Sequence, residues 1–425
     1  MPELSDRKQN AGQVPVHQKT VCIVGLGYVG FPLAEAFSQR VTTLGFDIDT
    51  SKIRTIQESG TAILATADPA QIRKADFVMI CVPTLLTPDN EPDLSYVRSA
   101  AETVGRNMKK GAIVILESTV YPGVTEDVLK PVLERESGYV CGRDFKIGYS
   151  PERINPGDDE HVLAKTTKIV AGMDEETTLE MKAIYSLITQ VYAAPDIRTA
   201  EAAKVVENIQ RDVNIALINE LSYIFHRLGL NTKNVLEAAG TKWNFHRYTP
   251  GIVGGHCIPT VPYFLAYSAK QSGYSPEMIL AGRATNDYMT RFIAELIIGH
   301  LNTCGKPVRN AGIVILGLTY KEDVADTRDN PVTELIRNLQ EQEITVYGYD
   351  PLLTPAEIAR MGVIPLEKLD KPVDGFILVV PHRQFLESAK EELRHLAKPD
   401  VVFVDIKGVF YKDPDFKKMF RYITL

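Results

Sequence analysis

The sequence feature that most constrains the fold is an apolar run that leads directly into a glycine-rich turn. The segment VCIVGLGYVG places Gly25, Gly27 and Gly30 in GxGxxG spacing. The apolar run Thr20–Val24 precedes the turn, and a helical pattern over Phe31–Gln39 follows it. A strand, a tight glycine turn and a helix in this order form the first unit of a parallel α/β sheet. We therefore expect the folded part of the chain to begin with a nucleotide-sized β–α–β unit.

An acidic residue in the right place extends this prediction to a cofactor. Asp47 ends the next apolar run, Thr43–Asp47, 22 residues after Gly25. A carboxylate at this position accepts hydrogen bonds from the adenosine ribose, and it would repel the 2′-phosphate of NADP, so NAD is the predicted cofactor. Gly27 would let the backbone approach the pyrophosphate, and Gly30 would allow close packing of helix on strand. The alternative is a glycine turn in an α/β domain without a cofactor.

Short apolar runs alternate with helical patterns in the first and last parts of the chain. Continuous apolar runs separated by helices are typical of parallel strands that are buried on both faces. The second series resembles the first: Gly317 and Gly348-Tyr349-Asp350 repeat the pattern of Gly25 and Gly45-Phe46-Asp47. The predicted strands are Thr20–Val24, Thr43–Asp47, Phe77–Val82, Ile113–Glu117, Lys146–Tyr149, Gly312–Leu316, Thr345–Tyr349, Gly375–Val380 and Val401–Asp405.

The middle of the chain reads as helical. Apolar residues recur at three- and four-residue steps from Thr199 to Leu228, which predicts one long helix that stops at Gly229. Helical patterns continue over Lys233–Ala239 and Pro276–His300. The predicted fold is α/β, with two Rossmann-like doubly wound domains joined by a long central helix and a helical region. The predicted divisions are a flexible tail (1–18), an NAD-binding domain (19–198), a central helical dimerisation domain (199–304) and a second Rossmann-like domain (305–425).

Composition excludes several classes of protein and indicates a cellular compartment. Lys plus Arg number 47 against 54 Asp plus Glu, a net charge of −7, which argues against a general nucleic-acid binder because such proteins need a basic face. Five scattered cysteines without a CxxC pair favour a reducing compartment. No apolar stretch approaches the roughly 20 residues of a membrane span. We therefore predict a cytoplasmic protein with no membrane span and no metal site.

Two motifs carry candidate catalytic groups. Cys257 lies in the glycine-rich segment GGHCIP, where a substrate could approach a thiolate closely; the alternative is a buried structural cysteine. Lys204 and Asn208 are one turn apart on the predicted long helix and could point at one site, with Asp212 and Asn219 further along. The alternative for this polar stripe is a helix face in solvent.

Three further segments follow predicted strands, where open α/β sheets bind ligands. Glu117–Thr119 and Ser150–Arg153 could supply carboxylates and hydroxyls for acid–base chemistry; their alternatives are helix capping and surface charge. Gly317–Asp323, with Arg328 beyond it, follows the first strand of the last domain. Lys321 and Arg328 there could pair with phosphates, and the alternative is a charged loop.

Together these motifs resemble the nucleotide-sugar 6-dehydrogenase family, which includes UDP-glucose and GDP-mannose dehydrogenases. The resemblance runs from about Thr20 to Tyr411 and includes the family's catalytic cysteine loop, GGHCIP. SPERINPGD (150–158), EAAKVVENIQRDVNIALINEL (201–221) and AAGTKWNF (238–245) most resemble the branch that acts on UDP-N-acetylhexosamines. Within it they are more similar to the N-acetylglucosamine and N-acetylgalactosamine enzymes than to the mannosamine enzyme.

The resemblance implies an NAD-dependent four-electron oxidation of the C6 hydroxyl to a uronate, for surface polysaccharide or glycan synthesis. The implied substrate is UDP-N-acetylglucosamine, with UDP-glucose, UDP-N-acetylgalactosamine and UDP-N-acetylmannosamine as alternatives. Cys257 would carry a thiohemiacetal and then a thioester, and Lys204 and Asn208 would stabilise the oxyanion at C6. Glu152 would accept a proton and Thr119 would lie near a catalytic water.

The resemblance also assigns binding residues and a homodimer built through the central helix. It makes the last domain the UDP-binding domain, and a basic side chain of the partner, His246 or Arg247, would reach the sugar. The implied cofactor contacts are Gly25, Gly27, Tyr28, Val29, Gly30, Asp47, Lys52, Pro83, Thr84, Ser118, Thr119 and Arg328. The implied substrate contacts are Glu152, Arg153, Lys204, Asn208, Arg247, Tyr248, Gly254, Tyr320, Lys321 and Lys407.

The chain departs from the family pattern at two positions. The family has an aspartate four residues after the cysteine, where this sequence has Val261. We hypothesise that Glu152 or another carboxylate then supports hydrolysis of the thioester without the family aspartate. The alternative is a catalytically impaired nucleotide-sugar binding protein. A late family arginine is replaced by Lys407, in Asp405-Ile406-Lys407. Lysine keeps the charge but loses the bidentate fork, so affinity or sugar choice is expected to differ.

Overall fold

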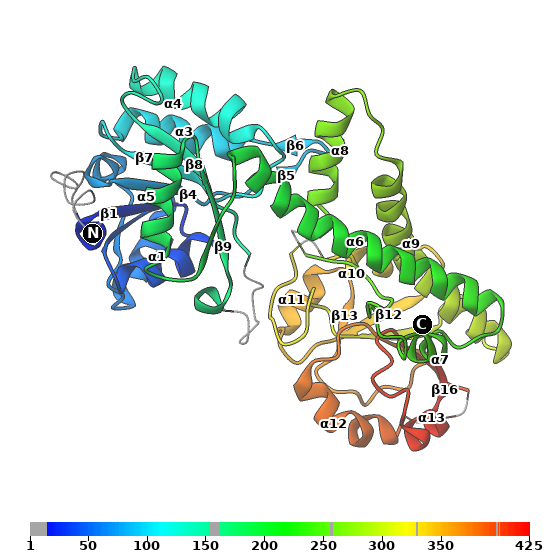
Figure 1. Cartoon of the computed structure of the whole chain (residues 1–425). Helices are drawn as coiled ribbons and strands as arrows, with labels where there is room; N and C mark the ends of the chain where they lie inside the picture. The colour runs from blue at the N-terminus through cyan, green and yellow to red at the C-terminus, as the bar shows by residue number, and fades with distance from the viewer. Residues whose placement is uncertain (1–14, 154–161, 256–257, 329, 397, 399) are drawn as a thin grey trace, which may run out of the picture. The chain divides into compact units, whose positions relative to one another are not determined.

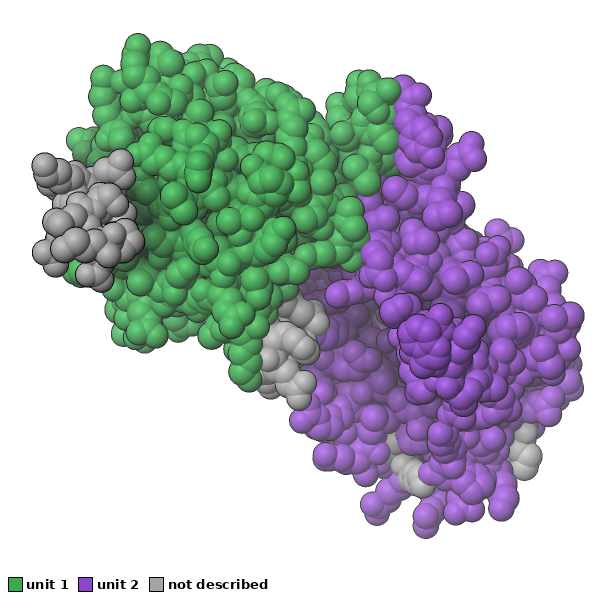
Figure 2. All heavy atoms as spheres, in the orientation of Figure 1, with its two compact units in different colours: residues 1–207, 263–272 green, residues 208–262, 273–425 purple. Residues whose placement is uncertain are grey.

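The computed structural model describes residues 15–153, 162–255, 258–328, 330–396, 398 and 400–425 (Figure 1). The chain divides into two compact units, coloured separately in Figure 2. The first contains residues 1–207 and 263–272, and the second contains residues 208–262 and 273–425. The long helix α6 (Ile197–Arg227) contributes residues to both. The division into domains at residues 198 and 304 stays a prediction.

The first unit is built on an eight-stranded sheet in the order β10-β9-β8-β7-β4-β1-β2-β3. Neighbouring strands are parallel except β8 and β9, which are antiparallel. The order reverses between β1 and β4, and ligands bind at this crevice in open α/β sheets. The strands are β1 (Thr20–Val24), β2 (Thr42–Phe46), β3 (Leu64–Thr66), β4 (Phe77–Ile80), β7 (Ile113–Leu116), β8 (Lys146–Tyr149), β9 (Lys168–Gly172) and β10 (Val191–Ala193), with a separate hairpin of β5 (Leu85–Leu86) and β6 (Pro92–Asp93).

Helices cover both faces of this sheet, which explains its continuously apolar strands. α3 and α4 pack their buried residues on one face, and α1, α2 and α5 pack on the other. The helices are α1 (Gly30–Ser38), α2 (Thr50–Glu58), α3 (Ser95–Asn107), α4 (Lys130–Ser137) and α5 (Glu175–Tyr185), with short helical turns at η1 (Val16–Gln18), η2 (Pro69–Lys74), η3 (Thr125–Leu129) and η4 (Leu163–Lys165).

The second unit contains a six-stranded, wholly parallel sheet in the order β13-β12-β11-β14-β15-β16. α9, α10 and α11 pack on one face, and α12 and α13 on the other. The strands are β11 (Gly312–Leu316), β12 (Thr345–Tyr349), β13 (Ile364–Pro365), β14 (Gly375–Leu378), β15 (Val402–Asp405) and β16 (Arg421–Thr424). The helices are α9 (Glu277–Thr303), α10 (Val332–Gln340), α11 (Pro355–Arg360), α12 (Arg383–Arg394) and α13 (Pro414–Met419).

The central part is helical, as predicted. α6 is followed by α7 (Thr232–Ala239), α8 (Val261–Gln271) and α9. Gly229 ends α6 with a φ of +69°, and the amide of Leu230 then donates to the carbonyl of Phe225. This hydrogen-bond pattern closes a helix over a left-handed glycine. The α/β fold with two Rossmann-like sheets and a long central helix is confirmed. In the described parts of the chain, no helix combines the length and apolar character that crossing a bilayer requires.

Candidate functional site

The glycine turn after β1 has the conformation that its sequence predicts. Gly25 has a φ of +93°, and a Cβ there would lie 2.7 Å from the carbonyl oxygen of Cys81. A Cβ on Gly30 would collide with the carbonyl oxygen of Gly25. By contrast, a Cβ built on Gly27 would have no described residue within 4 Å apart from its chain neighbours. The turn is therefore closed toward the sheet and open over Gly27, where a ligand could come close to the protein backbone.

Asp47 holds this turn from the end of β2. Its Oδ2 accepts hydrogen bonds from the amide of Leu26 and from Nζ of Lys52, both at 2.8 Å, and its Oδ1 accepts from the amide of Asp49 at 2.9 Å. Burial opposes ionisation, but the bonds from Lys52 and the two amides outweigh it and lower the pKa of Asp47. The side chain is a carboxylate at neutral pH and retains acceptor capacity on Oδ1. This fits a ribose hydroxyl.

The loops after β4 and β7 are joined beside the turn. The hydroxyl of Ser118 donates to the carbonyl of Val82 at 2.6 Å and accepts from the Val82 amide at 3.1 Å. The hydroxyl of Thr84 donates to the carbonyl of Thr119 at 2.7 Å. Neither Ser118 nor Thr119 caps a helix, so the capping alternative is wrong. The two hydroxyl residues instead shape the loops at the carboxyl end of the sheet.

A buried charge cluster lies at the ends of β7 and β8. Nζ of Lys168 is 2.5 Å from Oε2 of Glu117 and 3.3 Å from Oε2 of Glu152. The hydroxyl of Tyr185 also donates to Glu117. Glu117 is fully buried, so the surface-charge alternative is wrong for it. Burial raises the pKa of Glu117, whereas the two carboxylates raise the pKa of Lys168 against the opposing effect of burial.

The polar stripe on α6 is buried. Lys204 and Asn208 are 8% and 7% exposed, and Asp212 and Asn219 are fully buried. The alternative of a solvated helix face is therefore wrong. Asp212 pairs with Arg283 of α9, with 2.5 Å between Oδ1 and a guanidinium nitrogen, and it also accepts from Asn286 at 2.8 Å.

Asn219 links this network to a loop. Its side chain donates to the carbonyl of Gly251 at 3.1 Å and accepts from the Gly251 amide at 2.8 Å. It also donates to Asn286. The segment that leads to Gly254 is therefore fastened to α6 through its backbone.

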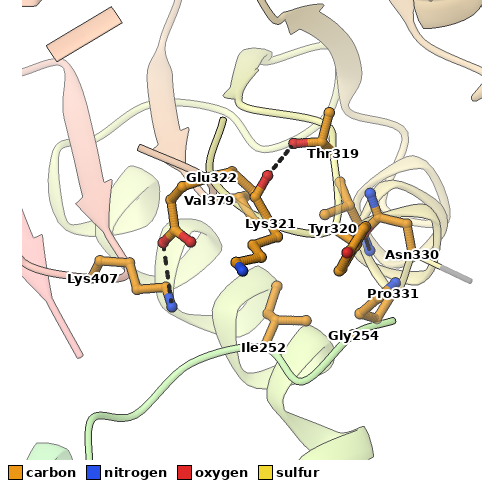
Figure 3. Close-up of a pocket in the computed structure, with 12 residues that line it drawn as sticks. Ile252, Gly254, Thr319, Tyr320, Lys321, Glu322, Asn330, Pro331, Val379 and Lys407 are labelled. Carbon is orange, nitrogen blue, oxygen red and sulfur yellow. Dashed lines mark hydrogen bonds and ion pairs between the residues drawn. The ribbon is translucent and has the colours of Figure 1, made fainter. Parts of the chain in front are cut away.

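A pocket in the second unit gathers four of the predicted substrate residues: Gly254, Tyr320, Lys321 and Lys407 (Figure 3). Lys321 and Lys407 point into the same part of the pocket, beside Ile252. Glu322 lies 3.7 Å from Nζ of Lys407. The pocket is at the carboxyl ends of β11 and β14, the strands at which this sheet reverses its order.

The loop after β11 is held in the same way as the turn after β1, by an aspartate that follows the neighbouring strand. Asp350 at the end of β12 accepts from the amide of Leu318 at 2.6 Å, as Asp47 does from Leu26. A second buried group is present here: Nε2 of His382 lies 3.0 Å from Asp350, and Nδ1 accepts from the amide of Asp323 at 3.0 Å. The repeat seen in the sequence therefore extends to a shared hydrogen bond, and His382 fixes the segment that carries Lys321.

The remaining predicted residues have varied surroundings. Arg153 pairs with Glu207 at 2.7 Å, Arg247 donates to the carbonyl of Gly240 at 2.8 Å, and Tyr248 accepts from Gln210. Tyr28, Pro83 and Arg328 are exposed, and Val29 and Lys52 are partly exposed. Cys257 and His256 lie outside the described residues. The cofactor, substrate and catalytic roles of all these positions stay predictions.

Sequence reasoning missed several buried polar residues. Lys168, Tyr185 and His382 were not singled out, although each is at most 1% exposed. The usable signal for Lys168 was a cation at the start of an otherwise apolar run, KIVAG. For His382 the signal was a histidine four residues after β14, in the repeat that contains Asp350.

Comparison with known protein families gives three matches in chain order. The NAD binding domain of the UDP-glucose/GDP-mannose dehydrogenase family matches residues 59–189. The central domain of that family matches residues 198–288, and its UDP binding domain matches residues 314–412.

Individual relatives span nearly the whole chain. CapL of Staphylococcus aureus is 42% identical over 413 residues, which cover 93% of this chain and 97% of CapL. A UDP-N-acetyl-D-glucosamine 6-dehydrogenase of Pseudomonas aeruginosa is 40% identical over 411 residues, covering 92% and 97%. Among solved structures, a UDP-D-ManNAc dehydrogenase from Pyrococcus horikoshii aligns with a TM-score of 0.82 at 28% identity, covering 95% of this chain and 99% of that one.

Proposed function

Because this chain belongs to the UDP-glucose/GDP-mannose dehydrogenase family and is an NAD-dependent UDP-sugar dehydrogenase, we propose that it oxidises the C6 hydroxyl of UDP-N-acetylglucosamine to the uronate. The observation that most supports a UDP-sugar as the substrate is the cationic pocket of the second unit. Lys321 and Lys407 there offer ammonium groups to a diphosphate. The N-acetylglucosamine relative at 40% identity supports the choice of sugar. The product would serve surface polysaccharide or glycan synthesis.

The first unit would hold the cofactor at the turn after β1. NAD supplies the acceptor for the hydride that leaves C6. Asp47 would accept from the ribose, and the open space over Gly27 leaves room for the pyrophosphate. α1 begins at this turn without a side-chain cap, so the positive end of its dipole is available to an anion there. Ser118 and Thr84 keep the neighbouring loops in place.

The proposed chemistry uses Cys257 as the nucleophile. After the first hydride leaves, the thiolate adds to the C6 aldehyde as a thiohemiacetal; loss of a second hydride gives a thioester, which water hydrolyses. Lys204 and Asn208 would stabilise the oxyanion at C6. Glu152 would accept the proton of the C6 hydroxyl, and Thr119 would lie near the water. The burial of Lys204 and Asn208 on one face of α6 supports a shared target.

Val261 bears on the hydrolysis step. It begins α8 and is buried, so an apolar side chain stands where the family pattern has a carboxylate. We propose that Glu152 then serves hydrolysis without that carboxylate. Two NADH formed per sugar consumed would support full oxidation, whereas one NADH would mean that the reaction stops at the aldehyde or at a trapped thioester.

We also propose a homodimer through the central helix, in the cytoplasm. Leu217 and Ile224 of α6 and Leu228, one residue beyond it, are 53%, 44% and 65% exposed, and their spacings of seven and four residues place them on one side. A Leu217→Glu, Ile224→Glu variant should be monomeric by light scattering. Leu179→Glu, on an exposed leucine of α5, is the matched control and should leave the oligomer unchanged.

A panel of UDP-sugars with NAD tests the proposed function, with NADH absorbance as the readout. UDP-N-acetylglucosamine should give the highest kcat/KM, above UDP-glucose and the N-acetylgalactosamine and N-acetylmannosamine forms. Cys257→Ser should lose turnover but retain NAD binding by calorimetry. A wild-type protein that binds UDP-sugars without reducing NAD, or a Cys257→Ser variant with unchanged turnover, would refute the proposal.

A further inference from the structure

One ammonium group in the first unit is buried between two carboxylates. Lys168 is the first residue of β9 and its side chain is 1% exposed. Its Nζ contacts Glu117 at 2.5 Å, the carbonyl of Pro151 at 3.0 Å and Glu152 at 3.3 Å. An ammonium has three protons to donate, so these three acceptors use all of them. The orientation of the ammonium is fixed by the ends of β7 and β8.

The charges in this cluster do not balance. Lys168 carries one positive charge, and Glu117 and Glu152 carry two negative charges when both are ionised. Among the described residues, Glu117 and Lys168 also face the hydroxyl of Tyr185 on α5, which donates to Glu117, and the thiol of Cys81 after β4. Burial raises the pKa values of both, so they are neutral near pH 7. With both carboxyls ionised, the ammonium and the two carboxylates therefore sum to one negative charge; the amide of Arg153 also donates to Oε1 of Glu152, at 2.6 Å.

The three charged groups differ in their access to solvent. The side chains of Glu117 and Lys168 are 0% and 1% exposed, whereas that of Glu152 is 12% exposed. Glu152 is therefore the member that exchanges a proton with a ligand or with water. The other two act on Glu152 through charge: the cation favours its ionised form, and the second carboxylate disfavours it.

We propose that Lys168 and Glu117 are positioning residues that orient the carboxylate of Glu152 and set its proton affinity for the oxidation of the sugar. The inference rests on the proposed function, in which C6 gives its hydride to NAD and the C6 hydroxyl gives its proton to Glu152. Glu152 then releases that proton to water. Lys168 holds Glu152 by an ion pair, and Glu117 limits the strength of that pair by sharing the same ammonium.

The proposal predicts opposite effects for two substitutions. Lys168→Met removes the cation, so Glu152 should ionise less readily and the acidic limb of the kcat/KM profile should move to higher pH. Glu117→Gln removes the competing charge but keeps one oxygen that can accept from Lys168, while its NH2 group can donate to the hydroxyl of Tyr185. In this variant the acidic limb should move to lower pH. Each shift should be roughly one pH unit or more, the effect of a charge within about 4–6 Å of a carboxyl.

A matched control comes from the neighbouring strand. Lys146 of β8 pairs with Asp174 at a more exposed site that does not contact Glu152. Lys146→Met should leave the acidic limb of the profile unchanged. Thermal unfolding of the protein without NAD or sugar supplies a readout other than activity. The Tm deficit of Lys168→Met should grow as pH rises, because two buried carboxylates then ionise with no cation between them.

The outcomes separate this inference from the proposed function. A merely structural role would lower activity in both variants without opposite movements of the acidic limb. Shifts in the same direction, or no shift in Glu117→Gln, would overturn the inference in an active wild-type enzyme. In Glu117→Gln the ammonium of Lys168 remains paired with Glu152, so this variant is a sufficient test if Lys168→Met does not fold. Full activity of Glu152→Gln, or an inactive wild type, would instead refute the proposed role of Glu152.

Discussion

Replacing Arg283 tests how the buried network between α6 and α9 stabilises the second unit. The Arg283 side chain is 3% exposed, and the Asp212 carboxylate that it contacts at 2.5 Å is fully buried. Arg283→Met keeps the apolar stem but removes the cation from Asp212. The carboxylate then retains Asn286 as a hydrogen-bond donor. We expect loss of stability because a buried anion remains without its positive partner.

The magnitude follows from the geometry. At an effective dielectric constant of about 20, two charges 2.5 Å apart attract by roughly 6–7 kcal/mol. The bond from Asn286 and protonation of the carboxyl offset part of this loss, so about 3–5 kcal/mol should be lost near neutral pH. This corresponds to a fall in Tm of roughly 10 °C. Arg291, whose exposed pair with Glu295 lies on the same helix, supplies the control. Arg291→Met should cost less than about 1 kcal/mol.

The pH dependence gives a second check. Burial raises the pKa of Asp212 above its usual value even beside Arg283, and removal of the cation should raise it further. A raised folded-state pKa contributes stability at low pH that is lost as pH rises through it. The Tm deficit of Arg283→Met, measured by circular dichroism at pH 5.5 and pH 8, should therefore be larger at pH 8. A deficit equal to that of Arg291→Met, or one that shrinks as pH rises, would refute the reasoning.

Three further predictions concern the ligand sites. Gly30→Ala should abolish NAD binding in calorimetry while the C-terminal sheet stays folded, because the new Cβ collides with the carbonyl of Gly25; unchanged NAD affinity would contradict this packing. Asp47→Ala should reduce the preference for NAD over NADP at least tenfold in kcat/KM, since the carboxylate that repels the 2′-phosphate is removed; an unchanged ratio would place the adenosine ribose elsewhere. Lys321→Met should raise KM for the UDP-sugar roughly tenfold with little change in kcat, through loss of a charge-assisted bond, and a change confined to kcat would show that Lys321 is not a diphosphate contact.

The strands that the sequence predicted best are buried, mostly apolar strands in the interior of their sheets. β1, β8, β11 and β12 have the predicted bounds. The missed strands include the four edge strands β3, β10, β13 and β16, of which β3 and β10 have three residues each and β13 has two. Such strands gain much of their stability from a neighbour, so their own residues carry a weak signal. β9 was also missed, although its five residues are buried, and a local pattern would not have specified its antiparallel direction.

The candidate site residues likewise divide into those that local sequence predicts and those that depend on tertiary packing. The glycine turn and Asp47 were found because a turn with a positive φ and a close helix contact needs specific residues at fixed spacing. The buried state of Lys204 and Asn208 was left open, since helical spacing shows which residues share a face but not whether another element covers it. The roles assigned to Cys257, Glu152 and the other site residues stay predictions.

The sequence by itself determined the parts that depend on neighbouring residues: the glycine turn after β1, the alternation of apolar runs with helices, and the length of α6. Only the tertiary structure decided that Lys168 lies between Glu117 and Glu152 and that His382 contacts Asp350. Glu117 and Lys168 are 51 residues apart, and Asp350 and His382 are 32 apart. Groups so distant in the chain meet only when strands pair and helices pack, and burial then gives their charges an effect on proton affinity that they lack in water.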